Sequence, residues 1–155
     1  MQLSKTPVRI SLFGGGTDYP EYIDHNQSLI VGGTINKFIY ICVTRLSIIS
    51  KENYRISYRT VESVEDVAQI EHPIFREVLR LYSLDKKYAF STVSDIPGSS
   101  GLGSSSALCV GLIKLVRSLK MPKLHELNCA EEAIFIEQSL LGENGGIQDQ
   151  NHAFY

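Results

Sequence analysis

The chain has 155 residues, 43% of them hydrophobic and 21% charged, which is the composition of a globular protein long enough for one domain with its own core. Its 15 Lys and Arg residues and 17 Asp and Glu residues give a net charge of −2, so the sequence predicts neither a nucleic-acid-binding nor a membrane-binding surface. Three cysteines without CxxC spacing and an N-terminus without a long apolar stretch predict reduced thiols and a cytoplasmic location.

The first half of the chain predicts β-strands. Residues 7–13 alternate between apolar and polar side chains, which predicts a strand, and Gly14–Gly16 predict a turn after it. Runs rich in Ile, Val, Tyr and Thr predict further strands, at 29–31, 34–45 and 54–59. Gly32 and Gly33 predict a break between the first two of these runs, and the polar residues 62–70 predict an irregular segment or a short helix.

The second half predicts mainly helices. Pro73 marks a helix start, and apolar residues at helical spacing continue to residue 83. A strand is predicted at 88–93 and two further helices at 104–119 and at about 124–141, with Gly142 as a stop. Together these elements predict a single α+β domain.

The segment 97–107 is rich in glycine and serine and leads directly into the apolar run 108–119. Glycine lets a backbone approach a ligand closely, and the first turn of the following helix presents free N–H groups, an arrangement that binds phosphate. No Lys follows Gly103, so this is not a P-loop, and hydroxyls and backbone N–H groups must bind the anion. A flexible linker is the alternative, which the direct entry into a helix disfavours. The predicted phosphate-binding residues are Pro97, Gly98, Ser99, Ser100, Gly101, Leu102, Gly103, Ser104, Ser105 and Ser106.

Three segments resemble signatures of the GHMP small-molecule kinases, the family of galacto-, homoserine, mevalonate and phosphomevalonate kinases. Residues 97–107 are similar to its second signature, 7–19 to its first, and 145–150 to the segment that carries the catalytic Asp in galactokinase-like members. The resemblance implies that residues 1–155 form the N-terminal domain of such a kinase, with a mixed β-sheet packed against helices. The third signature of the family lies in a C-terminal domain that this chain does not include.

Two charged residues are candidates for catalysis. Arg9 lies on the polar face of a strand just before a glycine turn, where it could orient a phosphate or simply be solvated. Asp149 follows two glycines, and from the residues alone a loop Asp bonded to its own backbone is the simpler interpretation. The resemblance implies that Asp149 accepts the proton of the attacking hydroxyl and that Arg9 lies beside it and stabilises charge.

The acceptor and metal sites are predicted in the same way. Thr17 and Asp18 follow the glycine turn and carry groups suited to sugar hydroxyls, although Asp is also common in turns. The substrate-binding residues implied by the resemblance are Gly15, Gly16, Thr17, Asp18 and Gly146. On a helical wheel Glu137 falls on the apolar side with Ala130 and Ala133, where a carboxylate is costly unless a cation meets it. The resemblance implies that Glu137 and Ser104 bind Mg²⁺.

The implied reaction transfers the γ-phosphoryl group of ATP to a sugar hydroxyl, with Mg²⁺ as the metal. Within the family the segments are most similar to those of heptose phosphate kinases, which implies the anomeric hydroxyl of a heptose 7-phosphate as the acceptor. A galactokinase- or fucokinase-like activity and a non-catalytic fragment or sugar-binding paralogue are the alternatives. We expect the isolated chain to have weak activity at most, and to self-associate through apolar surface left bare around residues 153–155.

Overall fold

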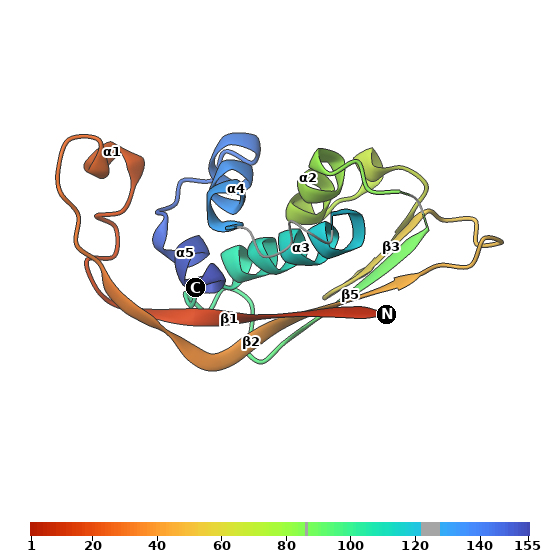
Figure 1. Cartoon of the computed structure of the whole chain (residues 1–155), viewed down its shortest axis with the longest axis horizontal. Coiled ribbons are helices and arrows are strands. Elements are labelled where there is room, and N and C mark those ends of the chain that lie inside the picture. The colour runs from red at the N-terminus through yellow and green to blue at the C-terminus, as the bar shows by residue number, and fades with distance from the viewer. Residues whose placement is uncertain (86, 122–127) are drawn as a thin grey trace.

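The computed structural model describes residues 1–85, 87–121 and 128–155, which form a five-stranded β-sheet with helices on one face (Figure 1). The strands are β1 (Gln2–Phe13), β2 (Val31–Arg45), β3 (Tyr54–Ser57), β4 (Val61–Val64) and β5 (Tyr88–Ser94). Their order across the sheet is β1-β2-β5-β3-β4. The pair of β3 and β5 is parallel and the other pairs are antiparallel, so the sheet is mixed and the predicted α+β class is confirmed.

The helical elements are α1 (Pro20–Ile23), the 3-10 turn η1 (Val67–Gln69), α2 (Pro73–Leu81), α3 (Ser104–Lys120), α4 (Ala130–Ile134), the π-helical segment η2 (Phe135–Leu140) and α5 (Gln148–Phe154). Helices α2, α3, α4 and α5 lie over one face of the sheet, whereas α1 lies apart, in the connection between β1 and β2 (Figure 1). Helix α3 is central, because it packs against β1, β2, α2 and α5. Within the described ranges no helix is long and apolar enough to cross a membrane.

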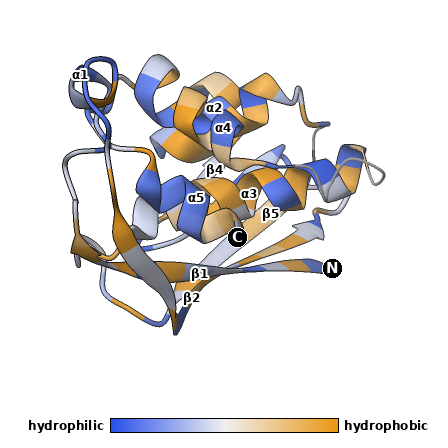
Figure 2. Ribbon diagram, turned by 60° about the vertical axis from the view of Figure 1, so that its left-hand side comes forward, coloured by the Kyte–Doolittle hydropathy of each residue, from blue (hydrophilic) through white to orange (hydrophobic). Residues whose placement is uncertain are grey.

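The core lies between the sheet and the helices and takes buried apolar residues from both layers. Figure 2 shows hydrophobic segments in the strands as well as in the helices. Ile41, Ile56 and Phe90 contribute from the strands, and Phe75 and Leu112 from α2 and α3; each is at most 1% exposed. Burial of side chains of this size stabilises a fold by roughly 1.5–3 kcal/mol each. The core therefore fixes α3 over the sheet and with it the glycine- and serine-rich segment that leads into α3.

Several predicted boundaries are wrong. β2 runs unbroken through Gly32 and Gly33, because both pair with residues of β1. The polar segment 62–70 begins within the short strand β4, whereas the short helix predicted there is present as η1. Strand β1 begins five residues earlier than predicted, at Gln2. Residues 124–127 of the predicted helix 124–141 lie outside the described residues. The rest of that helix begins at Ala130 and finishes as the π-helical segment η2.

The apolar surface expected around residues 153–155 is largely absent. Ala153 is 3% exposed and belongs to the core, and Phe154 packs partly against it. Tyr155 is exposed. The cause is α5, a helix that the sequence analysis did not predict and that turns Ala153 inward. Self-association stays a prediction, without the surface that was proposed for it.

Candidate active site

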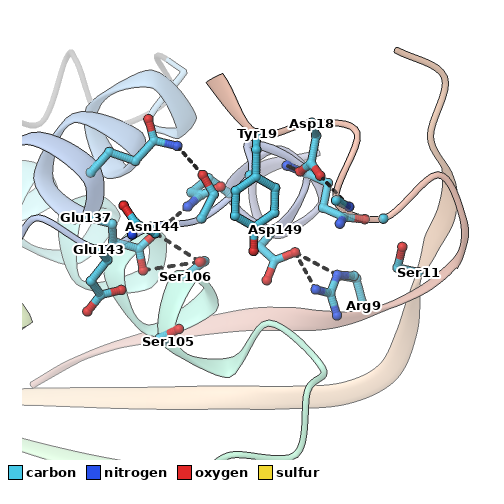
Figure 3. A pocket seen from close by; sticks show the side chains of 17 residues that line it. Arg9, Ser11, Asp18, Tyr19, Ser105, Ser106, Glu137, Glu143, Asn144 and Asp149 are labelled. Atoms are coloured by element: carbon cyan, nitrogen blue, oxygen red, sulfur yellow. Dashed lines mark hydrogen bonds and ion pairs between the residues drawn. The ribbon is translucent and has the colours of Figure 1, made fainter. Parts of the chain in front are cut away.

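Two cavities flank the start of α3. The first, of about 580 Å³, is polar and is lined by residues from β1, the Gly14–Gly16 turn, α3, η2 and α5 (Figure 3). The second, of about 430 Å³, has a largely apolar lining that includes Ile39, Tyr58 and His72, together with the cationic side chain of Arg59. Ser105, in the first turn of α3, lines both cavities. The start of α3 thus separates a polar cavity from a largely apolar one.

Arg9 and Asp149 form an ion pair in the polar cavity, as Figure 3 shows. Arg9 Nε donates to Asp149 Oδ1 at 2.8 Å, and Arg9 Nη2 lies 2.5 Å from the same oxygen. Arg9 Nη1 donates to the carbonyl oxygen of Gly101 at 2.8 Å, and the Arg9 backbone N–H donates to that of Leu102. One guanidinium therefore connects β1, the glycine-rich loop and α5.

The glycine-rich loop bends tightly before α3. Gly103 has a φ of +72°, in the left-handed region that favours glycine. A Cβ at this position would lie 3.0 Å from Asp149 Oδ2, so Gly103 also makes room for the carboxylate. Of the predicted phosphate-binding residues, Gly98, Ser104, Ser105 and Ser106 line one or both cavities. Pro97, Ser99, Ser100, Leu102 and the two glycines 101 and 103 lie outside both linings.

Glu137 is buried in the polar cavity, with 3% of its surface exposed. Burial raises the pKa of its carboxyl to about 7, and hydrogen bonds from Gln150 and Ser106 oppose that rise. Ser106 Oγ lies 2.9 Å and 3.2 Å from the two carboxylate oxygens, and Gln150 Nε2 donates to one of them. Glu137 lies in the π-helical segment η2, a distortion that is frequent at functional sites.

The serine that contacts Glu137 is Ser106, whereas Ser104 was predicted to share a metal with it. Ser104 lines the second cavity. Two residues apart on a helix correspond to a rotation of about 200°, so the two hydroxyls face opposite sides of α3. The structure therefore brings Glu137 together with Ser106 and not with Ser104.

The donors around Glu137 fit Mg²⁺. This ion prefers oxygen ligands and is usually held by one or two carboxylates together with waters and substrate phosphates. In the part of the chain that the structure describes there is no cluster of three His, Cys, Asp or Glu side chains that would hold a metal alone. A buried carboxylate beside a hydroxyl and an open cavity is a donor set of the kind that Mg²⁺ uses together with substrate phosphates.

The predicted acceptor residues lie mostly in the polar cavity. Gly15, Gly16, Asp18 and Gly146 line it. Thr17 does not, because its hydroxyl bonds to the carbonyl oxygen of Gly14 at 2.7 Å and to Ser28 Oγ at 2.8 Å.

The sequence analysis missed other residues of the two cavities, among them Ser11, Tyr19, Gln138, Glu143, Asn144, Gln148 and Gln150 in the first, and Tyr58, Arg59 and His72 in the second. Gln148 and Gln150 belong to α5, a helix with little apolar periodicity, so no sequence signal placed them on a face. His72 directly precedes Pro73 at the start of α2, a position that indicates a helix start and carries no sign of a ligand site.

The fold and the site together have the layout of a small-molecule kinase domain: a glycine- and serine-rich loop before a central helix, a buried carboxylate and an Arg–Asp pair. The family model described as the GHMP kinases N terminal domain matches residues 64–155. The chain belongs to this family.

Three proteins that are similar to this chain have names that state an activity. The chain is 34% identical, over 98% of its length, to a D-glycero-alpha-D-manno-heptose 7-phosphate kinase of Campylobacter jejuni. It superposes on a D-glycero-D-manno-heptose 1-phosphate kinase from Bacteriodes thetaiotaomicron with a TM-score of 0.80, 29% identity and 96% of this chain covered. A galactokinase of Lactococcus lactis, at 20% identity and a TM-score of 0.67 over 97% of this chain, shares the fold. The chain spans 48%, 51% and 41% of these three proteins, about half their length.

Proposed function

We propose that this chain is the nucleotide-binding part of a sugar kinase that transfers the γ-phosphoryl group of ATP to a sugar hydroxyl, with Mg²⁺. The observation that carries the proposal is the pair of cavities that meet at Ser105. A nucleotide lying across the start of α3 would have its base in the apolar cavity and its terminal phosphate in the polar one. The glycine- and serine-rich loop would lie under the phosphates between them.

The apolar cavity suits a nucleotide base. It combines the aromatic rings of Tyr58 and His72 with the aliphatic side chains of Ile39, Ile74 and Leu108. Burial lowers the pKa of His72, which favours the neutral ring against which an uncharged base packs. Gly98 and Ser104, which belong to the glycine- and serine-rich segment, line the same cavity. The phosphates of the bound nucleotide would extend out of the apolar cavity past these two residues.

In the polar cavity Asp149 would accept the proton of the attacking hydroxyl. Among the described residues its hydrogen bond and its ion pair with Arg9 are both made by Oδ1, which leaves Oδ2 for the substrate. Arg9 would orient Asp149 and stabilise negative charge at the reacting centre. Glu137 and the hydroxyl of Ser106 would hold Mg²⁺, with Ser104 left to the nucleotide side. Mg²⁺ would supply charge neutralisation on the phosphate oxygens.

The names of the relatives support a heptose phosphate as the acceptor. One observation favours a second candidate, an unphosphorylated sugar. Among the described residues that line the polar cavity, Arg9 is the one cationic side chain and is already paired, against the four carboxylates Asp18, Glu137, Glu143 and Asp149. Such a lining repels a second phosphate, so the phosphorylated end of a heptose phosphate would have to lie away from it.

The test is a direct transfer assay. The chain is incubated with MgATP and, separately, with heptose 7-phosphate, unphosphorylated heptose, galactose and fucose, and ³¹P NMR follows the products. We expect a new sugar phosphate ester with one of these acceptors, at a low rate. Calorimetry with a non-hydrolysable ATP analogue distinguishes the non-catalytic alternative, which would bind nucleotide and form no product. Absence of nucleotide binding would refute the proposal.

A glycine substitution tests the nucleotide path. A Cβ at Gly98 would meet no described atom within 4 Å, so Gly98→Ala changes the cavity without straining the free protein. We expect about a tenfold loss of ATP affinity, because the added methyl group crowds the ligand. Gly33→Ala, also in open space but outside both cavities, is the matched control and should bind ATP like the wild type. Gly103→Ala is unsuitable, since its methyl group would also press on Asp149. Equal affinities for all three proteins in calorimetry would place the nucleotide elsewhere.

A further inference from the structure

Asp18 is bound to the protein backbone on both of its carboxylate oxygens. It is 1% exposed although it lines the polar cavity. Oδ1 accepts the N–H of Gly16 at 3.1 Å, and Oδ2 accepts the N–H of Gln148 at 3.0 Å, from a residue 130 positions away in the sequence. Hydrogen bonds from backbone N–H groups to a carboxylate are among the stronger ones in proteins. Asp18 therefore connects the glycine turn after β1 to the first residue of α5.

The backbone at Gly146 is shaped around this carboxylate. A Cβ at Gly146 would lie 1.8 Å from Asp18 Oδ2 and 2.1 Å from its Cγ, far inside van der Waals contact. No residue other than glycine fits at this position without displacing Asp18. The close approach lets the chain run from Gly146 across the carboxylate and enter α5 with the N–H of Gln148 directed at Oδ2.

The residue that follows Gln148 is Asp149. Its backbone is thus fixed one residue upstream by Asp18, and its side chain is fixed by Arg9. Arg9 and Asp18 lie on either side of the same glycine turn, so both contacts join the first segment of the chain to α5 (Figure 3). Loss of the first contact would loosen the start of α5, a seven-residue helix that is too short to be stable alone and that otherwise packs against α3, α4 and β1.

We propose that Asp18 is a positioning residue: it fixes the start of α5 and so holds Asp149 against Arg9. Asp18 acts in this way through its two backbone contacts, to Gly16 and to Gln148. The effect of Asp18 on catalysis rests on the proposed role of Asp149 as the base. Its effect on the ion pair between Arg9 and Asp149 does not, because that ion pair forms without substrate.

The Arg9 side chain provides a direct readout. Its Nε–H group donates to Asp149 Oδ1 at 2.8 Å, and such a group gives its own signal in ¹⁵N NMR and exchanges slowly with water while the bond persists. Arg117 is an internal reference in the same spectrum, since its Nε–H group donates to the hydroxyl of Tyr82 at 2.7 Å, outside both cavities. The measurement is made on the whole chain without ATP or sugar, so it does not depend on whether the chain is a kinase.

In Asp18→Ala we expect the Arg9 Nε–H group to exchange at least about tenfold faster, the effect of one lost charge-assisted hydrogen bond, with Arg117 unchanged. Gly146→Ala should produce the same change while keeping the carboxylate, because it displaces Asp18 from its contacts. Asp24→Ala removes an exposed carboxylate of the same segment and should leave both signals as they are.

An Arg9 signal that stays protected in both Asp18→Ala and Gly146→Ala overturns the proposal. If acceptor binding is lost in these variants at the same time, Asp18 is a direct ligand of the sugar. Should Asp18→Ala lose the Arg117 signal as well, the domain has unfolded. Asp18→Asn, which keeps one acceptor oxygen and the side-chain volume, then carries the same comparison.

Discussion

Asp149→Asn should reduce phosphoryl transfer by about 10²–10⁴-fold, the usual contribution of a general base. The amide oxygen of Asn can still accept the hydrogen bond from Arg9, so the variant removes the basic oxygen and keeps the side chain in place. ATP affinity should therefore change little, whereas thermal stability should fall modestly, because the charge that pairs with Arg9 is lost. Initial rates at saturating MgATP and sugar, with calorimetry for ATP, measure the two effects separately.

The matched control for this variant is Asp24→Asn, which changes an exposed carboxylate in the turn after α1 and should keep full activity. A variant with Asn at position 149 that turns over at the wild-type rate would show that another group takes the proton.

Glu137→Gln should stabilise the metal-free protein at pH 8 and have little effect at pH 5. The pKa of Glu137 is raised by burial from 4.5 to about 7, so the folded state holds this proton more tightly than the unfolded state. As far as it depends on Glu137, the free energy of unfolding is highest below about pH 4.5, falls as the pH rises to about 7, and is then constant. At pH 8 the buried charge costs about 3 kcal/mol, and Gln, which is neutral at every pH, does not carry that cost.

Thermal melts in the presence of a chelator measure this difference. The melting temperature of Glu137→Gln should exceed that of the wild type by about 5–10 °C at pH 8, with the gap closing toward pH 5. Glu143→Gln is the control, because Glu143 lines the same cavity but is exposed. With Mg²⁺ and ATP added, the wild type should gain more stability than Glu137→Gln, because the variant lacks one proposed ligand of Mg²⁺. Parallel melting curves for wild type and variant from pH 5 to 8 would contradict a buried, ionising Glu137.

Much of the fold could be predicted because its signals are local. Alternation in residues 7–13 and helical spacing in 73–83 and 104–119 correspond to β1, α2 and α3. The sequence also predicted that Glu137 points inward, because on a helical wheel it falls on the apolar side with Ala130 and Ala133. The structure confirms that Glu137 is buried.

The parts that could not be predicted depend on distant contacts. Helix α5 consists mostly of polar residues, so it lacks the apolar period that indicates a helix, and it is held by Asp18 and by packing against α3. The choice between Ser104 and Ser106 depends on how α3 is rotated over the sheet, which the loop sequence alone does not contain. The apolar cavity is formed by Ile39, Tyr58 and Leu108, from three separate parts of the chain.

The ion pair between Arg9 and Asp149 joins residues that are 140 positions apart. During synthesis a chain is made from its N-terminus, and contacts of such long range form only after the second partner has left the ribosome. The hairpin of β1 and β2 and the loop before α3 can be in place well before that moment. On the proposed function, a nascent chain would contain the glycine- and serine-rich loop while the proposed base is still missing. Nucleotide bound to such a loop would favour folding of the part already made.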